Sequence, residues 1–366
     1  MDALNRNHVI GTITGPMLAS LDSPRSEQES SQVFRRHFNE IKRQIDLHPS
    51  KGSSPSQLLS EASEIVRSIS APCLPLGIAI CMHLYPYCAL QWFPLPRLSV
   101  ARLRRDALIR EICRGELILA NAGAARSAQV EHPVKGRRET AGMRIDGTFE
   151  YMSLASVADR ILFRAIIRGT GTTALCFTDA RSSSVRVASW KFSGSMRLSD
   201  TAAITFDNHL VPNGRYVLDD DPSRLDFASG YQRAWFHLLI AECHLARLQR
   251  LREEGLLQLG AEQIASLREL NHLGRHAGDL LNKRDLARLL PVSASIKLRT
   301  SLLSALAADA LRDSSDETAR PHELQYIRLQ PTSDPEIQRD QVGSARFSIA
   351  PEVSAPQRRF SLGRPL

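Results

Sequence analysis

The sequence predicts an α+β protein, in which an N-terminal helical domain is followed by a central antiparallel β-barrel or sandwich domain and a C-terminal helical bundle. Three observations support this. Residues 142–218 contain closely spaced runs in which polar and apolar residues alternate, as they do in strands. The residues before this block, and residues 231–312 after it, carry apolar side chains at helical spacing. Short strands separated by turn residues favour a small antiparallel barrel or sandwich.

The N-terminal region contains recognisable helix signals. Ser54 and Gln57 have the spacing of a capping box, and Pro55 stands at the first helical position. Residues 102–114 form a second amphipathic pattern, and Gly115 is predicted to end that helix in a left-handed conformation. Residues 32–46 are also predicted to be helical, and they are followed by a loop up to Pro55.

Residues 68–96 contain no Asp, Glu, Lys or Arg, and the segment is long enough to span a membrane. It also contains five prolines, which would leave backbone carbonyls unsatisfied in a lipid-facing helix: Pro72, Pro75, Pro86, Pro94 and Pro96. We therefore expect a helix that is buried inside the protein, and no membrane interaction.

The central block predicts several strands. Residues 142–146 with Gly147 are expected to form a strand end and a tight turn, after which Phe149 and Tyr151 alternate with Glu150 and Met152. Further strands are predicted over three runs, residues 160–168, 172–178 and 183–192. In a last strand, one face is expected to carry Ala202, Ile204, Phe206 and Asn208, and the other Thr205, Asp207 and His209.

The C-terminal region predicts an antiparallel bundle of three helices. They cover residues 231–254, residues 262–290 with a break near Gly274 and Gly278, and residues 292–312. Residues 313–366 are rich in Ser, Pro, Arg and Asp without periodicity, so an extended or disordered tail is expected there.

Composition excludes several classes of protein. The net charge of +8 favours an anionic partner, but the arginines are scattered without interleaved aromatics, so nucleic-acid binding is not expected. The six cysteines lack C-x-x-C spacing, which argues against a zinc site and predicts reduced, buried thiols in a cytoplasmic protein. No metal site is predicted.

Two segments of the β block resemble the acyl-CoA dehydrogenase family. Residues 194–212 (GSMRLSDTAAITFDNHLVP) are similar to its pattern G-M-R-x-S-D-T … V-x-F-D-N-V-x-V-P. Residues 147–159 (GTFEYMSLASVAD) are similar to the segment G-x-K-x-F-I-T … A-D, which runs beside the flavin ring in that family. Residues 115–127 stand where the family has a T-E-P-x-A-G-S-D loop. The resemblance extends over about residues 55–312.

This resemblance implies a domain division and an assembly. The N-terminal helical domain would cover residues 1–114, the β domain 115–220, the bundle 229–312 and the tail 313–366. The family forms homodimers or homotetramers through the bundle, so a homo-oligomer is expected. The implied cofactor is FAD, and the implied substrate is a small molecule or a carrier-bound acyl group.

The resemblance also implies cofactor-binding residues. In the first loop these are Ala120, Asn121, Gly123, Arg126 and Ser127, with Arg126 in the place of a phosphate-binding Ser. On the strand they are Tyr151, Met152 and Ser153. Ser153 matches the hydroxyl residue that contacts the reactive edge of the flavin, so it is also predicted to act in catalysis.

The carboxylate base of the dehydrogenases is not found. The family's Y-E-G-T segment is absent, and the first bundle helix has Gln232 and Arg233 where a minority of members place a Glu. Glu242, further along, is interpreted as a solvated or paired charge. One branch of the fold consists of flavin monooxygenases, which need no such base, and His83 matches a His of that branch. A core histidine bonded to the backbone is the alternative for His83.

Two hypotheses about function follow. The first is a flavin-dependent oxidoreductase that desaturates or hydroxylates an acyl thioester or a small molecule, in specialised metabolism. The second is a degenerate family member that keeps the fold without catalysis and acts as a subunit or binding protein. The missing base supports the second hypothesis, whereas the β segments support the first.

Overall fold

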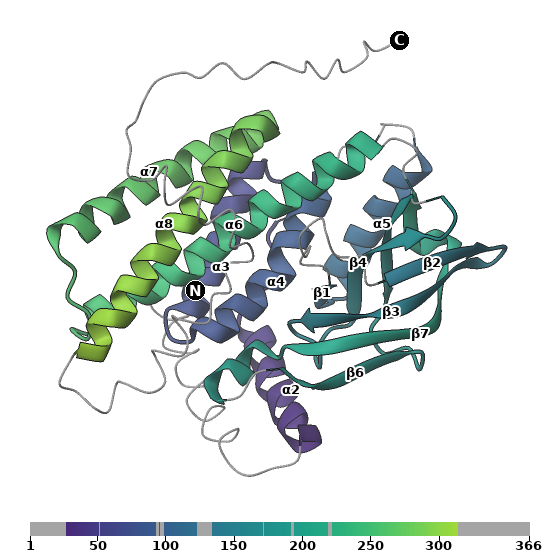
Figure 1. Ribbon diagram of the computed structural model, residues 1–366, viewed down its shortest axis with the longest axis horizontal. Helices are drawn as coiled ribbons and strands as arrows, with labels where there is room; N and C mark the ends of the chain where they lie inside the picture. The colour runs from purple at the N-terminus through teal and green to yellow at the C-terminus, as the bar shows by residue number, and fades with distance from the viewer. Residues whose placement is uncertain are drawn as a thin grey trace.

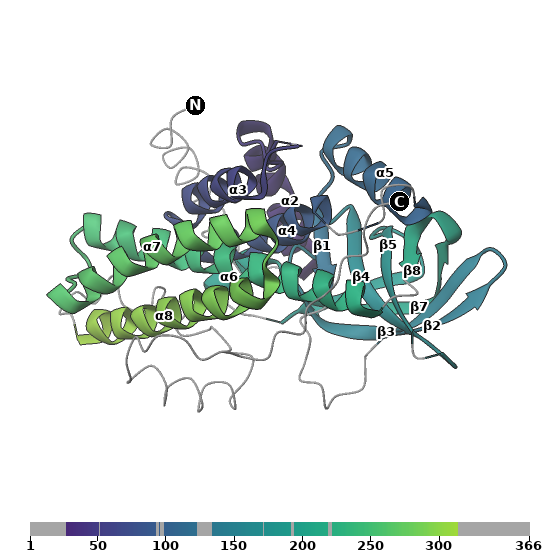
Figure 2. The ribbon, with the colours of Figure 1, turned by 90° about the horizontal axis from the view of Figure 1, so that it is seen from above.

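The computed structural model describes residues 27–50, 52–92, 95, 99–122, 134–170, 172–191, 194–218 and 222–313. Within these ranges, the chain forms a layer of helices beside a twisted β-sheet (Figures 1 and 2). The buried side chains divide in the same way into a large helical cluster and a smaller cluster inside the sheet. The predicted tail from residue 314 onward lies outside the described residues.

The described helices on the N-terminal side of the sheet are α2 (Glu27–Gln44), α3 (Pro55–Ser70), α4 (Leu74–Gln91) and α5 (Val100–Arg114). The capping box predicted for α3 is confirmed, because Ser54 Oγ accepts from the Gln57 N–H and Gln57 Oε1 accepts from the Ser54 N–H. The predicted cap of α5 is wrong in detail. Gly115 has φ −91°, and the left-handed residue is the next one, Glu116, with φ +46°.

Helix α4 contains the uncharged segment of the sequence. It is the one helix in the described ranges that is long and apolar enough to cross a membrane, and 83% of its most apolar window is buried inside the protein. It packs against α3 and α6, and Leu76, Ile80 and Leu84 have no exposed surface. Its uncharged composition therefore reflects a place in the core, as the prolines indicated.

The described strands form one eight-stranded sheet in the order β6-β7-β3-β2-β4-β5-β8, with β1 beside β4. Their bounds are β1 (Leu119–Ala122), β2 (Val134–Glu139), β3 (Gly142–Met152), β4 (Arg160–Ile167), β5 (Thr173–Asp179), β6 (Val185–Trp190), β7 (Ala202–Pro212) and β8 (Tyr216–Leu218). Short 3-10 helices precede β7 (η1, Gly194–Ser199) and follow it (η2, Asn213–Arg215).

The sheet differs from the expected antiparallel barrel in two ways. Its strand order does not close on itself, so a barrel is not confirmed. It is also mixed, because β1 and β2 both pair with β4 in parallel. Neither β1 nor β2 was predicted as a strand. β1 has only four residues, and the second half of β2 consists of three exposed charged residues, Arg137, Arg138 and Glu139, so neither strand shows clear alternation.

The predicted faces of the last strand hold only for its first half. Ala202, Ile204 and Phe206 are buried, but then Asn208 is exposed and His209 is buried. Asn208 has φ +45°, and the pairing of β7 with β3 shifts in register at this point. A bulge adds one residue to one strand and so exchanges the two faces. Gly147 lies in the same irregularity, inside β3, and not at the predicted turn.

The helices after the sheet are α6 (Pro222–Glu253), α7 (Ala261–Lys283) and α8 (Leu286–Asp313). α7 runs without a break through Gly274 and Gly278, contrary to the prediction. It ends instead at Arg284, which adopts a left-handed conformation with φ +54°. Pro291 lies inside α8, in its second turn.

Helices from both ends of the chain share one core. α6 packs against α3 and α4, and α7 packs against α3. The N-terminus of α3 is tied to the end of α7 by two hydrogen bonds, from the Ser56 N–H to Asn282 Oδ1 (2.9 Å) and from Asn282 Nδ2 to Ser56 Oγ (2.9 Å). The helical layer is therefore built from residues on either side of the sheet in the sequence.

Candidate functional site

The two segments that carry the family resemblance lie side by side. β3 pairs with β7 over most of its length, with Phe149 opposite Ile204 and Met152 opposite Ala202. The contact continues beyond the strands, because Ser153 Oγ lies 2.9 Å from Thr201 Oγ1. The residues expected to sit beside a flavin and the M-R-x-S-D-T pattern therefore form a single structural unit.

A tight turn follows β3 and fixes Ser153. Leu154 has φ +60° and Asp200 has φ +47°, both in the left-handed region that non-glycine residues seldom occupy. The Leu154 N–H donates to the Ser199 carbonyl (3.3 Å), and the Ala155 N–H donates to the Asp200 carbonyl (2.9 Å). Strained residues of this kind persist where the surrounding structure determines them, and they are frequent at binding sites.

The carboxylate of Asp200 also stabilises this turn, through hydrogen bonds from Ser156 and Trp190. It has no exposed surface, and it accepts hydrogen bonds from the Ser156 N–H (2.7 Å), Ser156 Oγ (2.8 Å) and Trp190 Nε1 (2.9 Å). Burial raises the pKa of Asp200 to about 6, although these hydrogen bonds oppose the shift. Asp200 was not predicted as a site residue. Its only signal in the sequence is its place within the M-R-x-S-D-T pattern.

The three predicted residues on the strand face different surroundings. Tyr151 is 53% exposed, and the ammonium of Lys191 lies 5.8 Å from the centre of its ring. Met152 is buried in the cluster inside the sheet, so it can offer a ligand only its backbone. Ser153 is half-buried. Tyr151 and Ser153 therefore present side-chain groups to the surface of this unit, and Met152 anchors the strand.

The predicted cofactor-binding residues of the first loop also differ in their exposure to solvent. Ala120 is fully buried in the sheet cluster, on β1. Asn121 is half-buried, and its Nδ2 donates to the hydroxyl of Tyr85 on α4, whose ring meets that of Phe236 on α6 at 5.4 Å between centres. Asn121 thus stands where the sheet meets the helical layer. The other three predicted residues of this loop lie outside the described residues: Gly123, Arg126 and Ser127.

His83 lies within the core of the helical layer. Its Nδ1 accepts from the Leu119 N–H at 3.0 Å, and its ring stacks on Tyr87 and meets His48 edge-on. Burial, together with the neighbouring His48, lowers the pKa of His83 to about 3, although backbone hydrogen bonds oppose the shift. The imidazole is therefore neutral at pH 7 and is used to join α4 to β1. This geometry is that of a core histidine.

Three titratable residues of α6, Glu242, His237 and His244, are also engaged in contacts between helices. Glu242 on α6 is ion-paired with Arg67 on α3. His237 and His244 face α8, where Ser293 Oγ lies 3.4 Å from Nδ1 of the first and Ser304 Oγ 3.3 Å from Nδ1 of the second. Burial lowers their pKa values to about 3 and about 4. These residues join the helices of the bundle to one another.

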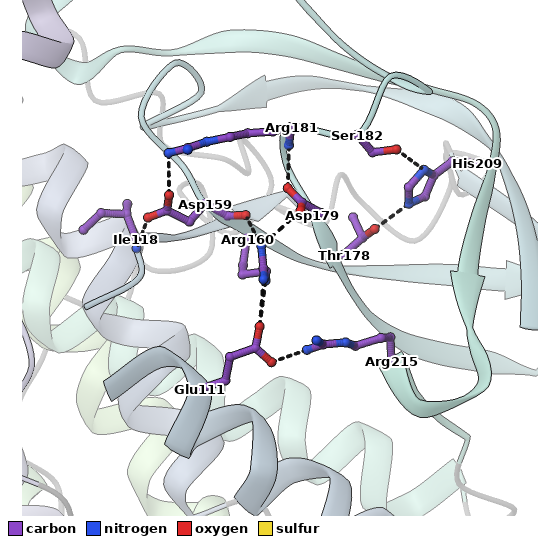
Figure 3. A network of polar contacts seen from close by, with 10 residues as sticks. All are labelled: Glu111, Ile118, Asp159, Arg160, Thr178, Asp179, Arg181, Ser182, His209 and Arg215. Carbon is purple, nitrogen blue, oxygen red and sulfur yellow. Dashed lines mark hydrogen bonds and ion pairs between the residues drawn. The ribbon is translucent and has the colours of Figure 1, made fainter. Parts of the chain in front are cut away.

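A polar network fastens α5 to the sheet (Figure 3). Glu111 accepts from Arg160 on β4 (2.8 Å) and from Arg215 in η2. Burial would raise the pKa of Glu111, but the hydrogen bonds from the two guanidinium groups outweigh it and hold the pKa below its usual value. Asp159 extends the network, because it accepts from the Ile118 N–H (2.9 Å) and from Arg181 (2.6 Å).

Two cavities lie outside the Ser153 unit. One of about 230 Å³ lies between α5 and the sheet, beside Glu111 and Arg215. The other, of about 470 Å³, lies on α6 and α7 and is lined in part by Arg67, Arg252 and Arg268. None of the predicted site residues that the structure describes lines either cavity.

No protein-family model and no curated protein sequence matches the chain. Solved structures do match it over nearly its full length. TdsC from Paenibacillus sp. A11-2, in a complex with FMN and indole, has a TM-score of 0.70 and 16% identity, covering 93% of this chain and 95% of that one. The methanesulfinate monooxygenase MsuC from Pseudomonas fluorescens has a TM-score of 0.68 and 13% identity, covering 96% and 98%.

A third similar structure is KijD3 in complex with FMN and a dTDP-linked amino sugar. It has a TM-score of 0.67 and 14% identity, covering 93% of this chain and 94% of that one. TdsC is described as a dibenzothiophene monooxygenase. These likenesses show that the chain has the fold of TdsC, MsuC and KijD3, which is an acyl-CoA dehydrogenase-like fold.

Proposed function

We propose that this protein is a flavin-dependent oxidoreductase of the monooxygenase type. One observation carries the proposal. The segment that resembles the family's flavin-side strand ends in Ser153, whose hydroxyl is held in place by Thr201 from the second family-like segment. Leu154, which follows Ser153, and Asp200 in the facing segment both have left-handed backbone, which persists where the surrounding structure fixes a turn.

The described residues fit a flavin in part. Tyr151 is an exposed aromatic residue suited to pack against a planar ring, and Ser153 has a half-buried hydroxyl suited to a hydrogen bond with a ring nitrogen. Asn121 lies at the junction of sheet and helices, with its carbonyl oxygen still able to accept a hydrogen bond. We assign Ser153 to the reactive edge of the ring and Tyr151 and Asn121 to its flanks.

When bound in its reduced form, a flavin supplies the electrons for the reduction of O₂. The chain's own residues would bind and orient it and limit the access of water. Glu242 is ion-paired with Arg67 and is not free to remove a proton from an acyl thioester. This supports oxygenation over desaturation, with a small molecule or a carrier-bound acyl group as the substrate. We retain a cytoplasmic homodimer or homotetramer as part of the proposal.

A second candidate is a member of the fold that does not catalyse a reaction. Two observations favour it. His83 is locked in the core by its bond to the Leu119 N–H, and Glu242 is locked in an ion pair. A protein of this kind would act as a subunit or binding partner and would not need a flavin.

Titration of the purified protein with flavin separates the two candidates. Oxidised and reduced FMN and FAD are each added to the wild-type chain, and binding is followed by flavin fluorescence and by anaerobic calorimetry. The oxidoreductase proposal expects saturable binding of at least one of them. FAD is implied by the resemblance and FMN by the TdsC and KijD3 complexes, and the same titration distinguishes the two.

Ser153→Tyr tests the site itself. A phenol ring in place of the hydroxyl adds bulk where the flavin would contact the turn, so flavin binding should fall at least about a hundredfold, the effect of losing about 3 kcal/mol of contact. Thr170→Tyr, at the exposed hairpin between β4 and β5, is the matched control. If both variants bind flavin as tightly as the wild type does, Ser153 does not contact the cofactor.

A further inference from the structure

The cavity between α5 and the sheet is lined by side chains from both layers. It has a volume of about 230 Å³, and its charged lining residues are Arg104, Arg105, Glu111 and Arg215. The rest of its wall is largely apolar and includes Leu90, Leu108, Leu162, Leu175, Phe177 and Val217. A mainly apolar cavity that carries a few polar groups is the usual form of a site for a small molecule.

Most of the charge beside this cavity is already paired. Glu111 accepts hydrogen bonds from Arg160 and Arg215, and Figure 3 shows both guanidinium groups directed at its carboxylate. Arg105 Nη2 lies 2.6 Å from Asp106 Oδ1 in an ion pair. Each of these three cations therefore has a carboxylate partner within the protein.

Arg104 is different. It is half-buried on α5, it lines the cavity, and its Nη1 donates to the Tyr216 carbonyl of β8 at 3.2 Å. Among the described residues it makes no other hydrogen bond and no ion pair, although a guanidinium has five N–H donors. A cation beside apolar walls is unfavourable without a counter-charge, and a guanidinium can bind a carboxylate through two parallel hydrogen bonds.

We propose that this cavity binds a small aromatic carboxylate, with the carboxylate on Arg104 and the ring between α5 and the sheet. The size of the ligand follows from the volume, because a cavity of about 150 Å³ accommodates benzene and about 230 Å³ leaves room for a carboxylate as well. The Glu111 carboxylate beside the cavity disfavours a doubly charged group such as phosphate. The site is separate from the Ser153 unit, and the inference does not depend on flavin binding.

Benzoate and its neutral analogue benzamide test the proposal, because they have nearly the same shape and differ in charge. Binding to the wild-type protein is measured by saturation-transfer NMR and by the shift in Tm. Benzoate should bind saturably with a Kd of about 1 mM or lower, and benzamide at least about tenfold more weakly. Arg104→Met should weaken benzoate binding to the level of benzamide binding. Arg110→Met, at an exposed position of α5 outside the cavity, should leave benzoate binding unchanged.

Leu175→Trp tests the place of the ring. The indole would occupy the cavity, so binding of both molecules should be lost, and Leu108→Trp on the opposite wall is used if the first variant does not fold. Ser153→Tyr should bind benzoate as the wild type does.

Three results would overturn the inference. The first is a wild type without saturable benzoate binding up to about 10 mM. The second is unchanged benzoate binding in Arg104→Met, and the third is unchanged binding in a folded Leu175→Trp or Leu108→Trp protein. Because none of these measurements uses flavin, failure of this inference is distinguishable from failure of the proposed function.

Discussion

Leu154 and Asp200 both have left-handed backbone, although they belong to different segments of the chain. Backbone hydrogen bonds join these segments, from the Leu154 N–H to the Ser199 carbonyl and from the Ala155 N–H to the Asp200 carbonyl. Each conformation costs of order 1–3 kcal/mol for a residue that is not glycine. The two strained turns occur together at Ser153, so the strain is concentrated at the position where the sequence predicts a cofactor contact.

The first prediction concerns the pH dependence that Asp200 imposes. Burial raises its pKa from 3.8 to about 6, so between these values the folded protein binds more protons than the unfolded chain does. The contribution of Asp200 to the free energy of unfolding therefore falls as the pH rises from about 4 to about 6, by up to about 3 kcal/mol. Asp200→Asn removes this dependence.

Urea unfolding of the wild type and of Asp200→Asn at several pH values between 4 and 8 measures this contribution. Other groups titrate in both proteins, so the difference between the two free energies isolates Asp200. That difference should change between pH 4 and pH 6 and then remain constant. If the two curves run parallel over the whole range, Asp200 does not titrate as its burial implies.

The second prediction concerns His83. Its pKa of about 3 lies below the usual 6.5, so the neutral imidazole stabilises the folded protein above pH 6.5, and this stability is lost as the pH falls toward 3. His83→Phe should remove that acid sensitivity. At pH 7 it should lower the free energy of unfolding by about 1–3 kcal/mol, because the Leu119 N–H loses its acceptor.

Flavin affinity distinguishes a structural from a catalytic His83. A core residue predicts that His83→Phe binds flavin within a few-fold of the wild type, once the folded fraction is taken into account. Ser153→Tyr, measured in parallel, shows the loss expected at the cofactor itself. If His83→Phe kept its stability and lost flavin binding, His83 would belong to the site.

The third prediction uses two helical glycines in different surroundings. A Cβ at Gly77 in α4 would lie 1.8 Å from Ser70 Oγ and 2.8 Å from Ser70 Cα, so α3 and α4 would have to move apart. Gly77→Ala should lower the free energy of unfolding by about 1–3 kcal/mol or more. A Cβ at Gly274 in α7 meets nothing within 4 Å, and Gly274→Ala should raise it by about 1 kcal/mol.

Thermal melting of the two alanine variants beside the wild type provides the measurement. Opposite shifts in Tm are expected, although both substitutions are chemically the same. A shift of the same sign and size in both would mean that helix propensity alone decides the result, and that α3 and α4 are not packed as closely as described.

The features that were predicted correctly are those that depend on residues close together in the sequence. The capping box of Ser54 and Gln57 and the hairpin of β4 and β5 follow from local spacing, and both are present. The reversal of faces at Asn208 was not predictable, because it depends on a register shift against β3. Two left-handed residues were also not predicted: Glu116 follows the glycine expected to take that conformation, Gly115, and Arg284 lies beyond the helix break expected near Gly278.

The candidate site, like the fold, was predictable only where its residues are close together in the sequence. Tyr151 and Ser153 could be proposed from the sequence because they belong to a contiguous pattern. Thr201 and Asp200 are 47 or more residues away from them in the sequence, and only the pairing of β3 with β7 brings them together. His83 shows the opposite limit. It was matched to a family position by its sequence pattern, but its environment is that of the core.

The bonds between Ser56 and Asn282 join residues that are 226 positions apart. The sheet is, in this sense, an insertion into a discontinuous domain, whose first helices emerge from the ribosome long before their partners do. During synthesis, the apolar surface of α4 stays exposed until α6 has been made, because α6 packs against it. Premature termination before α6 would leave this surface of α4 exposed. Long-range contacts of this kind slow folding and favour aggregation. Chains cut short before α6 should therefore depend on chaperones to stay in solution.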